Sequence, residues 1–259
     1  PFARLLTRNY PRVLMYHRFS DGQESGKVSS TTLEKQLQEL KKNFHVISIS
    51  DFIECQKEEL KRKNIVMITI DDGYADFYDY AYPLFKKYEI PATIYITTDF
   101  IHQKIWLWPD KVHYILEHSK KSGSVLPLSR ADYVLELNTE QDKQRAFDFL
   151  NEHCLQLSTH ERNEFIQQLA KFLEVEIPES PTLDYAPMNW EQVKELTENN
   201  IEIGAHTCTH PVMSKLKPDE LYKEIKHCKV DIEDAIGCSI RSFCYPNGTP
   251  ADYNEVVKE

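Results

Sequence analysis

Runs of apolar residues recur along the chain with the lengths and spacing of buried β-strands. Six segments have this pattern: residues 12–16, 45–49, 65–70, 93–97, 201–205 and 240–245. Several of them are almost continuously apolar, which is typical of parallel strands that are covered on both faces. The pattern therefore predicts a largely buried parallel sheet.

Helical patterns lie between these strands. Residues 30–42 combine a capping-box pair, Thr31 and Glu34, with leucines every three or four positions. Another helix is expected to begin near Pro218 and to end at Gly237. Strands that alternate with helices predict an α/β fold with a parallel sheet or barrel.

Residues 102–187 interrupt this alternation. They are polar, charged and rich in helical patterns, and Ser158 and Glu161 have capping-box spacing. We expect a helical insertion within a single domain that spans residues 1–259. The insertion either packs as a helical subdomain without chemistry or forms a lid or one wall of a substrate channel.

Composition narrows the classes of partner. The chain has 259 residues, 41% of them hydrophobic, and a formal net charge of −10. This length is sufficient for a sizeable core. The acidic balance argues against a nucleic-acid partner, which favours a basic surface, and against docking on anionic lipid. A neutral substrate is compatible with this negative net charge.

The six cysteines have neither the spacing of a zinc ribbon nor the pattern of a disulfide framework. They favour a reducing compartment, such as the cytoplasm, although a location in the cell envelope stays open. The sequence contains no apolar run of about 18 residues, so no transmembrane helix is predicted.

Polar residues follow four of the predicted strands. In parallel α/β folds, functional groups gather where the strands end. The residues in question are His17 after the first strand, Asp71, Asp72 and Gly73 after "IVMITI", His206 and His210 in "HTCTH", and Tyr245 to Gly248 in "YPNG". Their shared position at strand ends is the main functional signal that the residues themselves provide.

The two histidines and the two aspartates suit a catalytic metal site. Histidines four residues apart can converge on one ion, and such a site uses three protein ligands and one open position. One aspartate could be the third ligand, while the other takes a proton from water. Each motif alone also has an ordinary interpretation: surface or capping histidines for "HTCTH", and a turn or helix cap for "DDG".

Taken together, "TIDDG", "HTCTH" and "RSFCYPNG" resemble the three signature motifs of polysaccharide deacetylases, carbohydrate esterase family four, in the family's order. Ile70 stands where the family usually has an aromatic residue. The block from "VLMYHRF" to "TIDDGY" resembles a circularly permuted branch that includes exopolysaccharide and poly-N-acetylglucosamine deacetylases. The resemblance covers about residues 12–100 and 186–250. It implies a distorted (β/α) barrel of about seven parallel strands. Since six strands are predicted, either the C-terminus is missing or the barrel is open there.

The resemblance implies one divalent metal ion, zinc in the first instance and otherwise cobalt, nickel or iron. Its ligands would be Asp72, His206 and His210. The ion would polarise the acetamide carbonyl and lower the pKa of bound water.

The resemblance also assigns catalytic roles to the remaining motif residues. Asp71 would be the general base, and Arg241 would pair with it, orient it and keep it ionised. His17 would be the general acid that protonates the leaving amine, because the pKa of histidine lies near working pH. Tyr245 would contact the substrate and stabilise the oxyanion through its backbone N–H. Trp190 either lines the sugar groove or packs at a helix start.

The function that the resemblance implies is a metal-dependent hydrolase. It would remove N-acetyl groups from an amino-sugar polysaccharide, an oligosaccharide or their precursor. One alternative is a catalytically silent carbohydrate-binding module on the same scaffold, which would require a lost ligand, base or acid. Another is an amidohydrolase that acts on a different acylated substrate through the same site.

Overall fold

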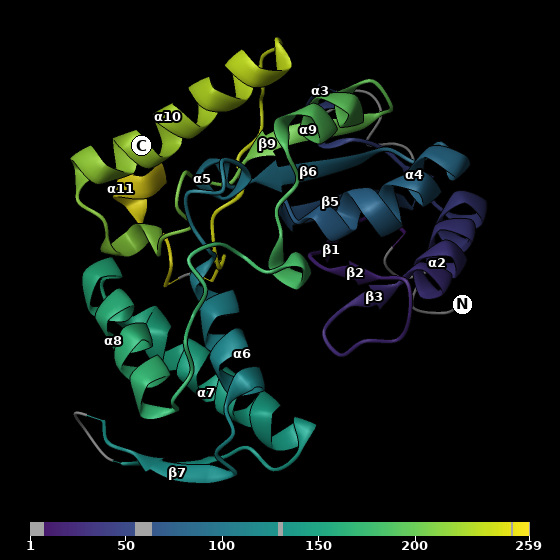
Figure 1. Cartoon of the computed structure of the whole chain (residues 1–259). Helices are drawn as coiled ribbons and strands as arrows, with labels where there is room; N and C mark the ends of the chain where they lie inside the picture. The colour runs from purple at the N-terminus through teal and green to yellow at the C-terminus, as the bar shows by residue number, and fades with distance from the viewer. Residues whose placement is uncertain (1–7, 55–63, 129–131, 250, 259) are drawn as a thin grey trace.

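The computed structural model describes residues 8–54, 64–128, 132–249 and 251–258 (Figure 1). Its main sheet contains five parallel strands within these ranges. They are β1 (Arg12–Tyr16), β4 (His45–Val46), β5 (Ile65–Asp72), β6 (Ala92–Ile96) and β9 (Ile201–Ala205). The order is β1-β5-β6-β9, with β4 also paired to β5. The structure is therefore an α/β fold with a parallel sheet, and the described residues do not reach the expected seven strands.

Strand β5 is the centre of this sheet. All eight of its residues are buried, as its continuous apolar run predicts. The predicted strands at 12–16 and 201–205 have the same bounds in the structure. The run at 65–70 continues through both aspartates, and the run at 93–97 begins and ends one residue earlier.

The prediction of a strand over residues 45–49 is wrong beyond Val46. Helix α3, which spans Ile49–Glu54, begins at the last residue of the predicted strand. The backbone N–H of Asp51 donates to the Ser48 hydroxyl at 3.0 Å, and the N–H of Ser48 donates to the Asp51 carboxylate at 3.4 Å. This reciprocal pair satisfies amides at a helix start, so polar capping ends the strand early.

The predicted strand at 240–245 is also not formed. Only an isolated bridge joins Phe243 to Ala205, with hydrogen bonds from Ala205 N–H to the Ser242 carbonyl and from Cys244 N–H to the Ala205 carbonyl. Pro246 lacks the N–H that would continue this pairing, which explains why it stops.

Five helices share one hydrophobic core with alternate residues of β5 and β6, and so pack against the same face of the sheet. They are α2 (Ser30–Asn43), α4 (Tyr82–Tyr88), α5 (Thr98–Ile101), α9 (Trp190–Thr197) and α10 (Pro218–Ile236), with a π-helical turn at Phe77–Ala81 before α4. The leucines of α2 are buried, as predicted. Its N-cap, however, is Ser29, whose side chain accepts from the Thr32 N–H, and not Thr31. Helix α10 ends at Gly237, which has a positive φ of 73°.

The chain between α5 and α9 forms a separate packing unit. It contains α6 (Trp108–His118), the antiparallel strands β7 (Gly123–Leu126) and β8 (Tyr133–Glu136), α7 (Glu140–Gln156), α8 (Thr159–Phe172) and a turn at Leu183–Tyr185. These helices share a hydrophobic cluster of their own. Ser158 and Glu161 form the predicted capping box. The segment thus contains a strand pair in addition to helices.

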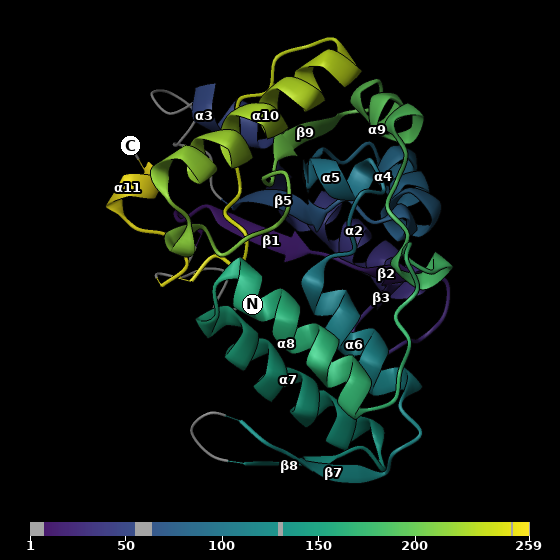
Figure 2. The same cartoon turned by 60° about the vertical axis from the view of Figure 1, so that its left-hand side comes forward.

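Figure 2 shows the sheet between α10 on one side and α6, α7 and α8 on the other. The remaining elements are the short parallel strands β2 (Phe19–Ser20) and β3 (Val28–Ser29), a turn at Met213–Lys215 and α11 (Glu255–Lys258). None of the described helices combines the length and apolar character needed to cross a bilayer.

Candidate active site

The register of the sheet brings the predicted site residues to one edge. Asp72 is paired with Ile96 on β6, and Ile96 is paired with Ala205 on β9. His206 follows Ala205 directly. It therefore lies two strands away from Asp72, at the same end of the sheet. The adjacent aspartates do not obey strict alternation, because Asp72 and Gly73 have positive φ angles of 77° and 98°.

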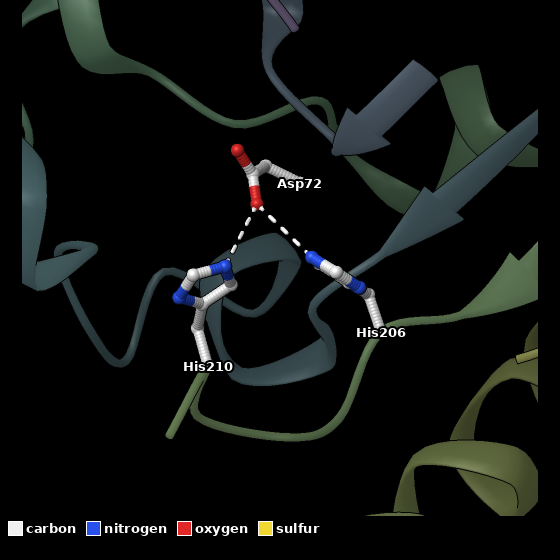
Figure 3. A group of neighbouring side chains, drawn as sticks. All are labelled: Asp72, His206 and His210. Carbon is white, nitrogen blue, oxygen red and sulfur yellow. Dashed lines mark ion pairs between the residues drawn. The ribbon is translucent and has the colours of Figure 1, made fainter. Parts of the chain in front are cut away.

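Asp72, His206 and His210 converge on one point (Figure 3). The Nε2 atoms of His206 and His210 lie 3.5 and 3.3 Å from Oδ1 of Asp72. All three side chains are buried. Two ligand atoms bound to one tetrahedral zinc ion lie about 3.3 Å apart, given zinc–ligand distances of about 2.0–2.2 Å. The spacing therefore fits a divalent metal.

The hydrogen bonding of the trio supports the same conclusion. Oδ1 of Asp72 is buried without a hydrogen-bond partner, which is costly unless a ligand supplies one. Nδ1 of His206 donates to the Cys244 carbonyl at 2.8 Å, so its Nε2 lone pair is free to face Asp72. Metal-binding histidines usually have such a partner on the second nitrogen.

Burial also sets the protonation of these groups. It raises the pKa of Asp72 to about 7, and the nearby Arg18 guanidinium opposes part of this rise. Burial lowers the pKa of His206 to about 4 and the pKa of His210 well below its usual value. Both imidazoles are therefore neutral at pH 7, which is the form that binds a metal.

The loop between the two histidines is fixed by Glu224 of α10. Its carboxylate accepts hydrogen bonds from the backbone N–H groups of Cys208 and Thr209 at 2.8 and 2.9 Å, and from the Thr209 hydroxyl at 2.7 Å. The loop includes the strained positive φ angles of Thr207 and His210. Glu224 thus holds the loop in the conformation that points both imidazoles at Asp72. Sequence reasoning missed it, because its helix position gives no local signal.

Asp71 lies beside the trio but has different neighbours. The Nε2 atom of His17 lies 3.9 Å from its Oδ2, and the Cys244 thiol donates to the same oxygen at 3.7 Å. Burial raises the pKa of Asp71 to about 7, while His17 lowers it and Asp72 raises it further. A carboxyl group that titrates near neutral pH is suited to take a proton from water.

Arg241 does not pair with Asp71, contrary to the prediction. Its guanidinium bonds to the carboxylate of Glu54 at the end of α3, and both side chains are exposed. Arg241 therefore faces the end of α3 rather than the buried aspartates. The Cys244 thiol bonds to Asp71 instead.

Tyr245 and Trp190 are placed differently relative to the trio. Tyr245 directly follows Cys244, whose carbonyl accepts from His206, and its ring stacks on Tyr253 with centroids 4.8 Å apart. Trp190 is the first residue of α9, and its indole N–H donates to Nδ1 of His102 at 3.3 Å. Its described contacts are with His102 and the main core, and none of them reaches the trio.

Arg18 is a second residue that sequence reasoning missed. It follows His17, and its Nε donates to Asp76 at 2.6 Å while its guanidinium lies 4.0 Å from the Tyr74 ring centroid. The Tyr74 hydroxyl donates to both carboxylate oxygens of Asp110 at 2.9 Å. The only feature of the sequence that pointed to Arg18 was its position next to His17.

The sequence profile of one family matches most of the chain. The family is described as "Polysaccharide deacetylase", and the match covers residues 58–259. Among individual proteins, the "Putative polysaccharide deacetylase YxkH" of Bacillus subtilis is 31% identical over 108 residues, which are 41% of this chain and 38% of that protein.

Two further proteins are similar. A "Poly-beta-1,6-N-acetyl-D-glucosamine N-deacetylase" of Staphylococcus aureus is 27% identical over 164 residues, 54% of this chain and 56% of that protein. The matches thus span well under two thirds of both curated relatives. The solved structure of the Streptococcus pyogenes deacetylase PplD in complex with acetate has the same fold, with a TM-score of 0.59, 19% identity and coverage of 95% of this chain and 76% of that chain.

Proposed function

Since the chain belongs to the polysaccharide deacetylase family, we propose that it is a metal-dependent hydrolase that removes N-acetyl groups from an amino-sugar polymer. The observation that carries the proposal is the buried cluster of Asp72, His206 and His210 beside a second buried carboxyl group, Asp71. This cluster offers three neutral or anionic ligands and a separate base. That combination serves the hydrolysis of an amide.

The reaction adds water to the acetamide carbonyl carbon and breaks its C–N bond, which releases acetate and a free amine. When bound, the divalent ion supplies a Lewis acid, and zinc is the ion that the ligand set and spacing favour. Asp71 takes a proton from the attacking water. His17 donates a proton to the amine nitrogen as it leaves, which its partly exposed position beside Asp71 allows.

Two assignments have weaker geometric support. The backbone N–H of Tyr245 would donate to the developing oxyanion, and its place directly after Cys244, beside the trio, is compatible with this role. Arg241 could orient Asp71 only if its guanidinium first released the carboxylate of Glu54. We therefore assign the orientation of Asp71 to its contacts with His17 and Cys244.

The polymer to test first is poly-β-1,6-N-acetyl-D-glucosamine. The support is the likeness to the Staphylococcus aureus protein named for that substrate. The acidic net charge of this chain is compatible with such a neutral polymer.

We also infer a single catalytic domain over residues 1–259 with an insertion at 102–187. The supporting observation is that the insertion packs around its own hydrophobic cluster while the flanking strands β6 and β9 pair directly. The parallel sheet would then be part of a distorted barrel.

Release of acetate from a β-1,6-linked N-acetylglucosamine pentamer tests the proposal. The protein with zinc or cobalt should release acetate, and a chelator should stop it. Asp71→Asn should lower the rate by about 10²–10⁴-fold, as expected for the loss of a general base. Asp79→Asn, which changes an exposed aspartate at the neighbouring turn, is the matched control.

Binding of the pentamer by the metal-loaded protein without release of acetate, from the pentamer or from other acetylated sugars, would contradict the proposal and favour a carbohydrate-binding module.

A further inference from the structure

A cavity of about 700 Å³ lies between the insertion and the N-terminal part of the chain. Its walls come from the 24–27 segment between β2 and β3, from α6, from the start of α7 and from the 182–185 turn. The volume falls within the range of about 300–1,000 Å³ that is typical of small-molecule sites. None of the proposed metal ligands lines it, so it is distinct from the candidate active site.

Two consecutive residues of the chain contact this cavity and the candidate active site. His17 and Arg18 connect β1 with β2. His17 lies beside Asp71, whereas Arg18 lines the cavity. A polymer whose acetamide lies at Asp71 could therefore extend past this pair of residues into the cavity.

The charges of the lining argue against an anionic ligand. It contains five carboxyl groups and three lysine or arginine side chains. Each of these cations has an acidic partner within 3.0 Å, as follows: Arg18 with Asp76 at 2.6 Å, Lys27 with Glu24 at 2.8 Å, and Lys143 with Glu117 at 3.0 Å. No cation is left to recognise a phosphate or carboxylate, and the surplus of carboxyl groups suits a neutral or cationic ligand.

The uncharged part of the lining combines aromatic faces with hydrogen-bonding groups. The Tyr185 hydroxyl and Nδ1 of His113 share a hydrogen bond of 2.8 Å, and the His113 ring packs edge-on against Phe147 with centroids 5.6 Å apart. Rings offer flat apolar surface to the C–H face of a sugar ring, while carboxylates and amides such as Gln144 accept hydrogen bonds from its hydroxyl groups.

We propose that this cavity binds a second sugar unit of the polymer, next to the unit whose acetyl group is removed. The identity of the polymer rests on the proposed function. The ligand is an amino sugar that is either still acetylated, and neutral, or already deacetylated, and cationic. The insertion would then determine the length of chain that the enzyme prefers.

Binding is tested in the Asp71→Asn protein with zinc, so that the ligand is not consumed. Gln144→Trp introduces a large ring at the cavity wall, and Gln168→Trp, on an exposed position of α8 outside the cavity, is the matched control. Calorimetry with the acetylated and with the fully deacetylated β-1,6-linked glucosamine pentamer shows which form is preferred. We expect Gln144→Trp to weaken binding of at least one pentamer tenfold or more, and Gln168→Trp to change it less than twofold.

Equal affinities of both tryptophan variants for both pentamers would overturn the proposal, as would the absence of binding in the Asp71→Asn protein. Should Gln144→Trp fail to fold, His113→Ala replaces it with the same expectation. Acetate release by the protein that retains Asp71 is measured separately. Cavity-dependent binding without acetate release would contradict the proposed function alone, and acetate release with cavity-independent binding would contradict this inference alone.

Discussion

The Nε2 atom of His17 lies 3.9 Å from Oδ2 of Asp71, and the two side chains differ sharply in exposure, at 45% and 4%. The buried partner has its pKa raised to about 7 and can accept a proton near neutral pH. The exposed partner can reach a leaving group. This asymmetry supports the proposed roles, in which Asp71 takes a proton from the attacking water and His17 protonates the leaving amine.

His17→Ala should lower kcat for an N-acetylated amino-sugar substrate by about 10²–10⁴-fold, since the leaving amine would lose its proton donor. The loss should be much smaller for an acetanilide with a strongly electron-withdrawing ring, whose anilide leaves without prior protonation. Steady-state kinetics on both substrates measure the difference. His227→Ala, on the exposed face of α10, is the control. Equal losses on both substrates would rule out a role as general acid.

Glu224→Gln should weaken zinc binding by about 10–100-fold, because Glu224 holds the loop that carries His206 and His210 and so orients both ligands. The carboxylate accepts from two backbone N–H groups and one hydroxyl in the histidine loop, and the neutral amide offers a single acceptor oxygen. Competition with a zinc chelator gives the affinity. Glu176→Gln, at an exposed position of the insertion, should leave it unchanged. An unaltered affinity in Glu224→Gln would show that the loop holds its shape without this residue.

The stability of the protein should depend on pH through Asp110. Burial raises its pKa from 3.8 to about 7, so the folded protein holds a proton that the unfolded chain releases above about pH 4. The contribution of Asp110 to the free energy of unfolding therefore falls as the pH rises from 4 to 7, by up to about 4 kcal/mol. Asp110→Asn removes this titration.

Urea unfolding at several pH values, with a chelator present, compares Asp110→Asn with the unaltered protein. The variant should become relatively more stable as the pH rises through this range. Asp148→Asn, an exposed aspartate on α7, should follow the unaltered protein. A constant difference between Asp110→Asn and the unaltered protein across the range would contradict the assignment.

Arg162 is a buried cation without a counter-ion among the described residues. Its side chain is 2% exposed, its Nε and Nη1 atoms have no hydrogen-bond partner, and its guanidinium lies 4.8 Å from the Trp108 ring centroid. Replacing a poorly compensated buried charge with an apolar side chain of similar length commonly stabilises a protein by about 1–4 kcal/mol. Arg162→Met should therefore raise the Tm by about 2–10 °C, measured by calorimetry.

The matched control for this change is Arg145→Met, which removes an exposed guanidinium on α7 that pairs with Asp142. It should change the Tm by only about 1–2 °C, because exposed ion pairs contribute about 0–1 kcal/mol. A fall in the Tm of Arg162→Met would mean that the packing on Trp108 outweighs the cost of burying the charge.

Several parts of the fold and site could be predicted because their signals are local. The strands at 12–16 and 201–205 follow from apolar runs, and the end of α10 follows from Gly237. The convergence of Asp72, His206 and His210 follows from residues placed at the ends of parallel strands. Even the early end of the strand at Val46 had a local cause in Ser48 and Asp51, although the apolar pattern concealed it.

The strands at 12–16 and 201–205 and the polar residues at the strand ends could be identified from the sequence, since their signals depend on neighbours within a few positions. The partners of those residues depended on the tertiary structure. Arg241 pairs with Glu54 and not with Asp71, Glu224 holds the histidine loop, and Arg18 faces a cavity that the insertion encloses. These contacts join distant segments, and their geometry is set by how helices pack on the sheet. A pattern of local hydrophobicity carries no information about how the helices pack on the sheet.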